Sequence, residues 1–169
     1  GFSQDVHKHE RPSKAEVDSM LMANLTPKEQ ADKFGRLVIQ DLDGRMKPVN
    51  TYASELLRKL SKHDTYEDLD ANQAFLSMQE SPFLWWNVPI IFMKKKQADS
   101  IRTIINLPKE EEYATLAHFF SDKGEYLLGP YLEDAYKSSV PTAIQKKFRE
   151  ADQRVNLLYS TLDGTLLKL

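Results

Sequence analysis

The sequence predicts a mainly α-helical fold: a single α-rich domain of about six or seven helices, with a small β-hairpin and a long C-terminal amphipathic helix. Three observations predict it. Apolar residues recur at intervals of three and four in several segments, capping signatures precede those segments, and one Asp-Gly pair separates two short apolar runs. With 169 residues, of which 41% are hydrophobic and 28% charged, the chain is long enough to bury a core as one domain.

The first 12 residues lack apolar periodicity and are predicted to form a flexible linker or tag remnant, leaving residues 13–169 as the domain. The first helix is predicted to begin at Ser13, because Ser13 and Glu16 have the spacing of a capping box. Both ends of the chain have the character of cut ends, since it opens on a glycine and stops within an apolar pattern.

A second capping box is predicted at Thr26 and Glu29, with Pro27 at the first helical position. The resulting short helix should end at Gly35, because glycine readily adopts the conformation that closes a helix.

The clearest non-helical segment consists of residues 37–40, the tetrapeptide Asp41-Leu42-Asp43-Gly44 and residues 45–49. The Asp-Gly pair favours a tight turn, because Gly44 accepts the positive φ that such turns require. A small β-hairpin is therefore predicted.

Three further helices are predicted from capping and periodicity. Asn50 or Thr51 should cap the first, in which apolar residues follow at helical spacing. Asp70 and Gln73 form another capping box, and Pro82 ends the helix that they open. The longest helix should run over residues 142–161, with a buried seam of Ile144, Phe148, Ala151, Val155, Leu158 and Leu162.

Between these helices the pattern is weaker. Residues 88–93 are predicted to form a strand or an extended loop, limited by Pro89 to a sheet edge. Short helices are expected around residues 101–105 and 113–120, and another near Pro130.

Charge and composition exclude several functions. The formal net charge is −2, with 23 basic and 25 acidic residues, so no global field favours nucleic acid. The absence of cysteine excludes a thiol nucleophile, a redox pair and a thiolate metal site. No apolar run approaches the length of about 20 residues that a transmembrane helix needs.

One motif suggests an enzyme. An apolar strand ending in Asp41-Leu42-Asp43-Gly44 resembles the first motif of haloacid-dehalogenase-like phosphatases, in which Asp41 would be the nucleophile and Asp43 the general acid/base beside Mg²⁺. The residues that follow depart from that family, and the alternation of helices and parallel strands that it needs is absent. This phosphatase is therefore the alternative hypothesis.

Histidines and tryptophans supply the other candidate contacts. His63 follows a helix, and His118 lies beside an apolar helical stripe; both are candidate haem contacts, although an ordinary surface or partly buried histidine is the favoured interpretation of each. No metal site is predicted, because the histidines are scattered. Of the adjacent Trp85 and Trp86, at most one should be deeply buried, and the other is a candidate contact with a partner or ligand.

Residues 34–51 resemble a stretch of the large system II cytochrome c biogenesis proteins, fusions of a ResB-like and a CcsA-like part, in the form found in Bacteroidetes. The resemblance extends through residues 9–13, 70–73 and 152–156.

The resemblance implies a non-catalytic, extracytoplasmic (periplasmic) domain between membrane-embedded parts of the same polypeptide, which carries haem across the membrane and helps attach it to apocytochrome c. It assigns no catalytic residue here, and no cofactor is expected to be bound covalently. The missing cysteines agree with it, because a neighbouring thiol would compete for the apocytochrome's own thiols. On the hairpin, Arg45 and Lys47 are candidate contacts for haem propionates or a partner's carboxylates, or simply a solvated strand face.

Overall fold

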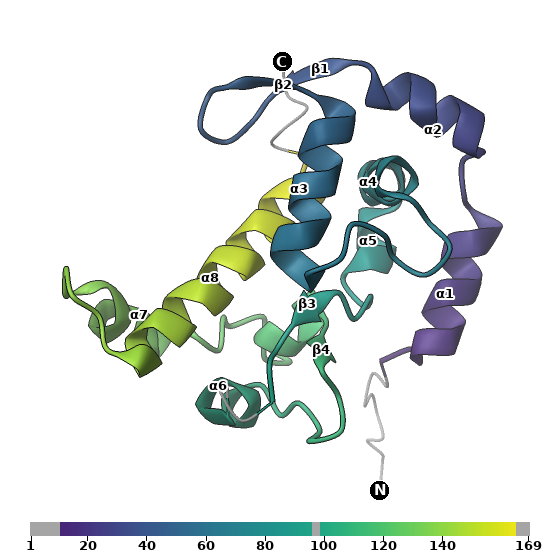
Figure 1. Cartoon of the computed structure of the whole chain (residues 1–169). Coiled ribbons are helices and arrows are strands. Elements are labelled where there is room, and N and C mark those ends of the chain that lie inside the picture. The colour runs from purple at the N-terminus through teal and green to yellow at the C-terminus, as the bar shows by residue number, and fades with distance from the viewer. Residues whose placement is uncertain (1–10, 96–98, 165–169) are drawn as a thin grey trace, which may run out of the picture.

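The computed structural model describes residues 11–95 and 99–164. It confirms the mainly α-helical fold class: eight α-helices and one 3₁₀ helix are accompanied by two small antiparallel sheets within these residues (Figure 1). The predicted linker at residues 1–12 lies almost entirely outside the described ranges and stays a prediction. None of the described helices is long and apolar enough to cross a membrane.

The elements follow one another along the chain as helices with two short interruptions by strands. In order, they are α1 (Lys14–Ala23), α2 (Lys28–Gly35), β1 (Val38–Gln40), β2 (Met46–Pro48), α3 (Val49–Ser61), α4 (Ala71–Glu80), α5 (Pro82–Trp85), β3 (Ile91–Phe92), α6 (Asp99–Ile104), β4 (Tyr113–Ala114), the 3₁₀ helix η1 (Leu116–Phe119), α7 (Gly129–Tyr136) and α8 (Ala143–Leu162).

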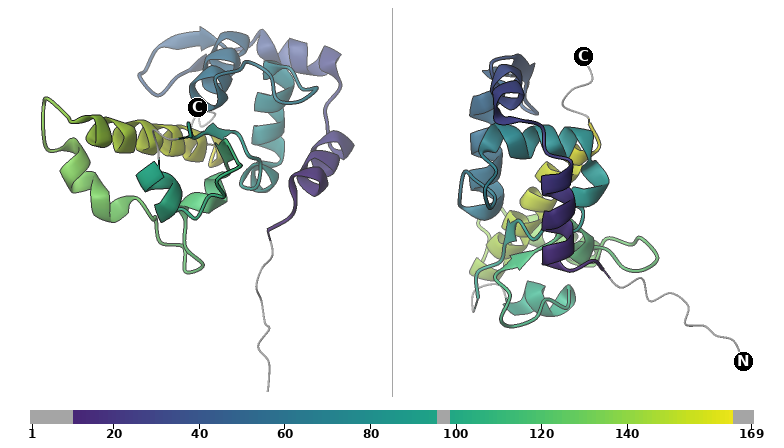
Figure 2. Two further views of the ribbon diagram at one scale, coloured as in Figure 1. Left: turned by 60° about the horizontal axis from the view of Figure 1, so that its bottom comes forward. Right: turned by 90° about the vertical axis from the view of Figure 1, so that its right-hand side faces the viewer.

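Helices α3, α4 and α8 form the centre of the molecule. Figure 1 shows α8 crossing α3, with the β1–β2 hairpin above the start of α3. In the left view of Figure 2, α7 lies beside α8, and α1 lies on the opposite side of the molecule, where it contacts α5. The hairpin, α3 and α8 therefore meet along one junction, and this junction positions the candidate site.

Capping explains where several helices begin. Ser13 with Glu16 and Asp70 with Gln73 both form reciprocal capping boxes, as predicted. The box predicted at Thr26 is wrong: Pro27 is the N-cap residue, and the Thr26 hydroxyl instead donates to Glu80 Oε1 at 2.7 Å. A proline already set in an extended conformation begins the helix without a side-chain cap.

The start of α3 also differs from the prediction. The N-cap residue is Pro48, not Asn50 or Thr51, and it makes no side-chain capping bond. The N–H of Val49 donates to the Leu37 carbonyl at 2.7 Å, so the hairpin passes directly into the helix. The main-chain pairing of the hairpin thus sets this helix boundary.

Residues 113–120 do not form the predicted helix. Tyr113–Ala114 is strand β4, which pairs antiparallel with Ile91–Phe92, so the strand interpretation of residues 88–93 is confirmed in part. A single 3₁₀ turn follows, because Thr115 and His118 form a capping box of their own. Side-chain capping and strand pairing therefore override the helical spacing of the apolar residues here.

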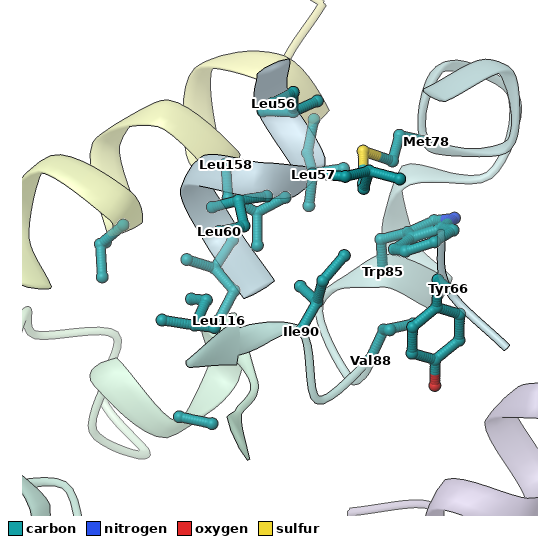
Figure 3. Close-up of a cluster of buried hydrophobic side chains, with 14 of the residues drawn as sticks. Leu56, Leu57, Leu60, Tyr66, Met78, Trp85, Val88, Ile90, Leu116 and Leu158 are labelled. Atoms are coloured by element: carbon teal, nitrogen blue, oxygen red, sulfur yellow. The ribbon is translucent and has the colours of Figure 1, made fainter. Parts of the chain in front are cut away.

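The core lies where α3, α5, η1 and α8 meet (Figure 3). Leu57 and Leu60 from α3 face Leu158 from α8, and each is fully buried. Burial of one such leucine contributes roughly 1.5–3 kcal/mol. This apolar contact fixes the angle between α3 and α8, and so the shape of the surface on either side of it.

The predicted seam of α8 is confirmed except at its first member. Five of its six residues are buried, but Ile144 is 63% exposed. The first turn of α8 packs beside α7 at the edge of the molecule (Figure 2), beyond the central core. Periodicity therefore identifies the face of this helix correctly and overestimates how far its burial extends.

Candidate functional site

The hairpin loop is held by the side chain of Asp41. Its Oδ1 accepts the backbone N–H groups of Asp43 and Arg45, both at 2.9 Å, and Oδ2 lies 3.0 Å from Lys47 Nζ. Gly44 has φ +83°, a conformation that favours glycine. The hydrogen bond from the Arg45 backbone, followed by that from the Lys47 side chain, lowers the pKa of Asp41.

Lys47 joins the hairpin to α3. Besides Asp41, its Nζ contacts Glu55 Oε2 at 2.7 Å. The hydrogen bond with Glu55, and then that with Asp41, raises the pKa of Lys47. Lys47 is therefore already engaged within the protein, whereas the side chain of Arg45 is exposed and makes no ion pair among the described residues.

The phosphatase hypothesis is not supported by this geometry. Its nucleophile must follow a strand in a parallel sheet, but both sheets within residues 11–95 and 99–164 are two-stranded and antiparallel. The Asp41 carboxylate is occupied by the turn and by Lys47, and no cluster of three or more His, Cys, Asp or Glu side chains suited to a metal ion occurs in these ranges. Asp41 and Asp43 are turn residues.

A groove of about 480 Å³, which we call the hairpin groove, separates the hairpin loop from α8. The Asp41–Lys47–Glu55 network forms one wall, and polar residues of α8 form the other. The lining residues are Asp41, Leu42, Asp43, Lys47, Tyr52, Glu55, Leu56, Lys59, Gln153, Asn156, Leu157 and Ser160. Sequence reasoning missed this groove, because no local pattern relates the hairpin to the second half of α8.

The two adjacent tryptophans have different environments. Trp85 is completely buried, and its Nε1–H donates to Ser77 Oγ at 2.9 Å, so it is a core residue and not a surface contact. Trp86 is half-buried and lies in an aromatic cluster, 5.3 Å from the ring of Phe120 and 5.9 Å from that of Tyr159. Trp86 therefore remains the candidate contact of this pair.

His118 is held in its capping box. Its Nδ1 accepts the Thr115 N–H at 2.9 Å and lies 2.7 Å from Thr115 Oγ1. Burial, together with the nearby Arg11 charge, lowers the pKa of His118 to about 4. In the neutral ring Nδ1 is the acceptor, so the proton is on Nε2. That nitrogen can donate a hydrogen bond but offers no lone pair to iron.

His63 is exposed and lines a separate depression of about 320 Å³ between the end of α3 and strand β4. No ring hydrogen bond is formed by His63 within the described part of the chain. Aromatic and apolar side chains share this depression with it, among them Tyr66, Ile90 and Tyr113. Arg45 and Lys47 thus lie at the hairpin, and His63 lies in its own depression. Trp86 and His118 are closer together, because the N–H of Ala117 in η1 donates to the Trp86 carbonyl at 3.0 Å.

No protein-family model matches the chain. The chain is similar to Protein NrfI of Wolinella succinogenes. The two are 30% identical over 145 residues, which cover 83% of this chain but only 15% of NrfI. The chain thus corresponds to a small part of a much longer relative.

Proposed function

We propose that this chain is a non-catalytic, extracytoplasmic domain of a membrane cytochrome c biogenesis protein, and that it supports haem delivery and attachment to apocytochrome c through contacts with a partner. The observation that carries the proposal is the similarity to NrfI over 83% of this chain, which points to the maturation of c-type cytochromes. The resemblance of residues 34–51 to system II proteins points to the same process and supports the extracytoplasmic location.

The hairpin groove is the surface that we assign to the partner. The ion pairs of Lys47 hold the loop against α3, so the groove exists before a partner arrives and little ordering is needed on binding. Arg45, at the loop beside it, exposes a guanidinium group that can bind a carboxylate in a bidentate manner. In the parent protein, the membrane-embedded parts of the same polypeptide are the second partner of this domain.

Binding of reduced apocytochrome c to the purified 169-residue chain tests this proposal. We expect saturable binding by calorimetry, weakened in Arg45→Glu and unchanged in Lys109→Glu, which alters the net charge equally at an exposed position elsewhere. Absence of binding by the unaltered chain, or equal weakening in both variants, would contradict the assignment of the hairpin groove.

Direct contact with haem is a second candidate function, and the depression beside His63 favours it. An exposed imidazole next to aromatic and apolar side chains is suited to a haem edge, whereas the Nε2 of His118 carries its proton. A haem titration should therefore show a Soret shift that disappears in His63→Ala and persists in His118→Gln. Glutamine can take the place of His118 in this capping box, because Gln73 occupies the equivalent position in the capping box of α4. No shift in the unaltered chain removes this candidate.

A further inference from the structure

A second surface, toward the other end of the α3–α8 junction, carries a concentration of positive charge. It adjoins the hairpin groove, since Lys59, Gln153 and Leu157 line both. Two adjoining depressions of about 320 and 340 Å³ share Lys62, Glu150 and Arg154 in their linings. We call them together the basic groove. It is lined by the end of α3, the end of β3 and the two residues that follow it, α6, and α8 from Lys147 to Leu157.

The basic groove contains five cations and one carboxylate. The cations are Lys59, Lys62, Lys94, Lys147 and Arg154, and the carboxylate is Glu150. Lys147 pairs with Glu150 at 3.3 Å, but Lys59, Lys62 and Lys94 form no ion pair within residues 11–95 and 99–164. Five positive charges and one negative charge leave +4 in this groove, although the whole chain has a formal net charge of −2. Such a local excess favours an anionic ligand.

Arg154 is a fixed cation at the centre of this surface. Its Nε donates to the Lys59 carbonyl at 3.1 Å and its Nη1 to the Phe92 carbonyl at 2.9 Å, so it joins α8 to α3 and β3. Both acceptors are neutral, and no carboxylate forms an ion pair with the guanidinium within the described ranges. Glu150, one turn earlier in α8, acts on the guanidinium only electrostatically, without an ion pair. A positioned guanidinium of this kind is well suited to a carboxylate from outside.

The backbone at Lys62 gives an independent indication. Lys62 closes α3 with φ +71°, a left-handed position at which helices usually place glycine. A lysine there retains backbone strain, and its side chain lines both depressions. Such backbone strain persists only where the surrounding structure holds it, and it is enriched at ligand-binding sites.

The rest of the lining is mostly apolar. It consists of Phe92, Met93, Ile101, Ala151 and Leu157, together with the polar Gln153. The α8 residues from Lys147 to Leu157 extend over about 15 Å, the length of four or five residues of an extended peptide. We propose that the basic groove binds an extended, acidic peptide segment of a partner protein, whose carboxylates contact Lys62, Lys94 and Arg154. This proposal goes beyond the role in cytochrome c maturation and does not depend on it.

Fluorescence anisotropy with a labelled peptide of sequence ELEELE tests the proposal on the purified 169-residue chain. We expect saturable binding that weakens as ionic strength rises. The double variant Lys62→Glu/Lys94→Glu should bind about tenfold more weakly or worse, because two contacts become repulsive. The matched variant Lys33→Glu/Lys109→Glu, with the same charge change at exposed positions outside the groove, should bind within about twofold of the unaltered chain.

Three results would overturn the proposal. The first is no binding of the peptide by a chain with a normal circular dichroism spectrum. The second is equal weakening by the two double variants, which identifies a diffuse charge effect. The third is preferential, groove-dependent binding of phosphatidylglycerol vesicles or oligothymidylate over the peptide, which assigns the groove to a membrane or a nucleic acid.

Discussion

The two ends of the α3–α8 junction use charge in different ways. At the hairpin end, Lys47 contacts two carboxylates, Asp41 at 3.0 Å and Glu55 at 2.7 Å. At the other end, Lys62 and Lys94 line the basic groove without an ion pair in the described residues. Paired charges fix the hairpin against α3, whereas unpaired charges remain available to a ligand. The difference between Lys47 and the pair Lys62 and Lys94 is therefore whether carboxylates lie within reach of the ammonium group.

The largest expected effect concerns the core that both ends share. Leu158→Ala should destabilise the chain by about 3 kcal/mol, because Leu158 is fully buried between α3 and α8 and its removal leaves a cavity. Urea unfolding followed by circular dichroism measures this. Ile144→Ala, on the exposed first turn of the same helix, should change stability by less than about 0.5 kcal/mol. Equal losses in the two variants would mean that α8 does not organise the junction.

Arg154→Met should cost about 2 kcal/mol, because two hydrogen bonds from a partly buried guanidinium to backbone carbonyls are lost. Arg45→Met, at the exposed hairpin position, should leave the unfolding free energy almost unchanged. A neutral effect of Arg154→Met would show that Arg154 does not connect α8 to α3, and would weaken the distinction between fixed and free cations in the basic groove.

Lys62→Gly should stabilise the chain, by roughly 0.5–1 kcal/mol, since glycine relieves the left-handed conformation at φ +71°. The same substitution should weaken binding of the acidic peptide. Thermal unfolding and anisotropy of one preparation measure both quantities. A loss of stability would contradict the backbone strain at Lys62. Unaltered binding would show that the Lys62 side chain does not contact the peptide.

The smallest expected effect is a pH dependence of the hairpin end. The pKa values of Asp41, through the Arg45 backbone and Lys47, and of Glu55, through Lys47, are lowered on folding. Their contribution to stability is therefore present above the unfolded pKa, about 4, and is lost as the pH falls through the lowered values. The difference in Tm between the unaltered chain and Lys47→Gln should be largest near neutral pH and should shrink in acid. A difference independent of pH would contradict the pairing.

Local signals predicted the elements well where the cause was local. The boxes at Ser13 and Asp70 place two helix starts correctly, and the Asp-Gly pair places the hairpin turn. The helix starts at Lys28 and Val49 were mispredicted, because prolines and strand pairing replaced the expected side-chain caps. The spacing of apolar residues in the sequence carries no information about these competing interactions.

The candidate sites were less predictable, because they depend on contacts between distant segments. For Lys47 the sequence offered a contact with a partner or a solvated strand face, and it did not indicate the ion pair with Glu55 on the next helix. The basic groove combines the end of α3 with Lys94 and with Lys147 and Arg154 of α8. Trp85 and Trp86 are adjacent in sequence, and only packing decides which of them is buried.

The most direct test of the central claim is the amount of covalently bound haem in the c-type cytochromes of cells whose parent protein lacks residues 13–169. Replacing this domain by a flexible linker, with the parent protein's abundance measured by immunoblot, isolates its contribution. The proposed function predicts a strong loss of haem-stained cytochrome c while the abundance of the shortened parent protein is unchanged. An unchanged level of haem-stained cytochrome c under those conditions would contradict a role of this domain in cytochrome c maturation.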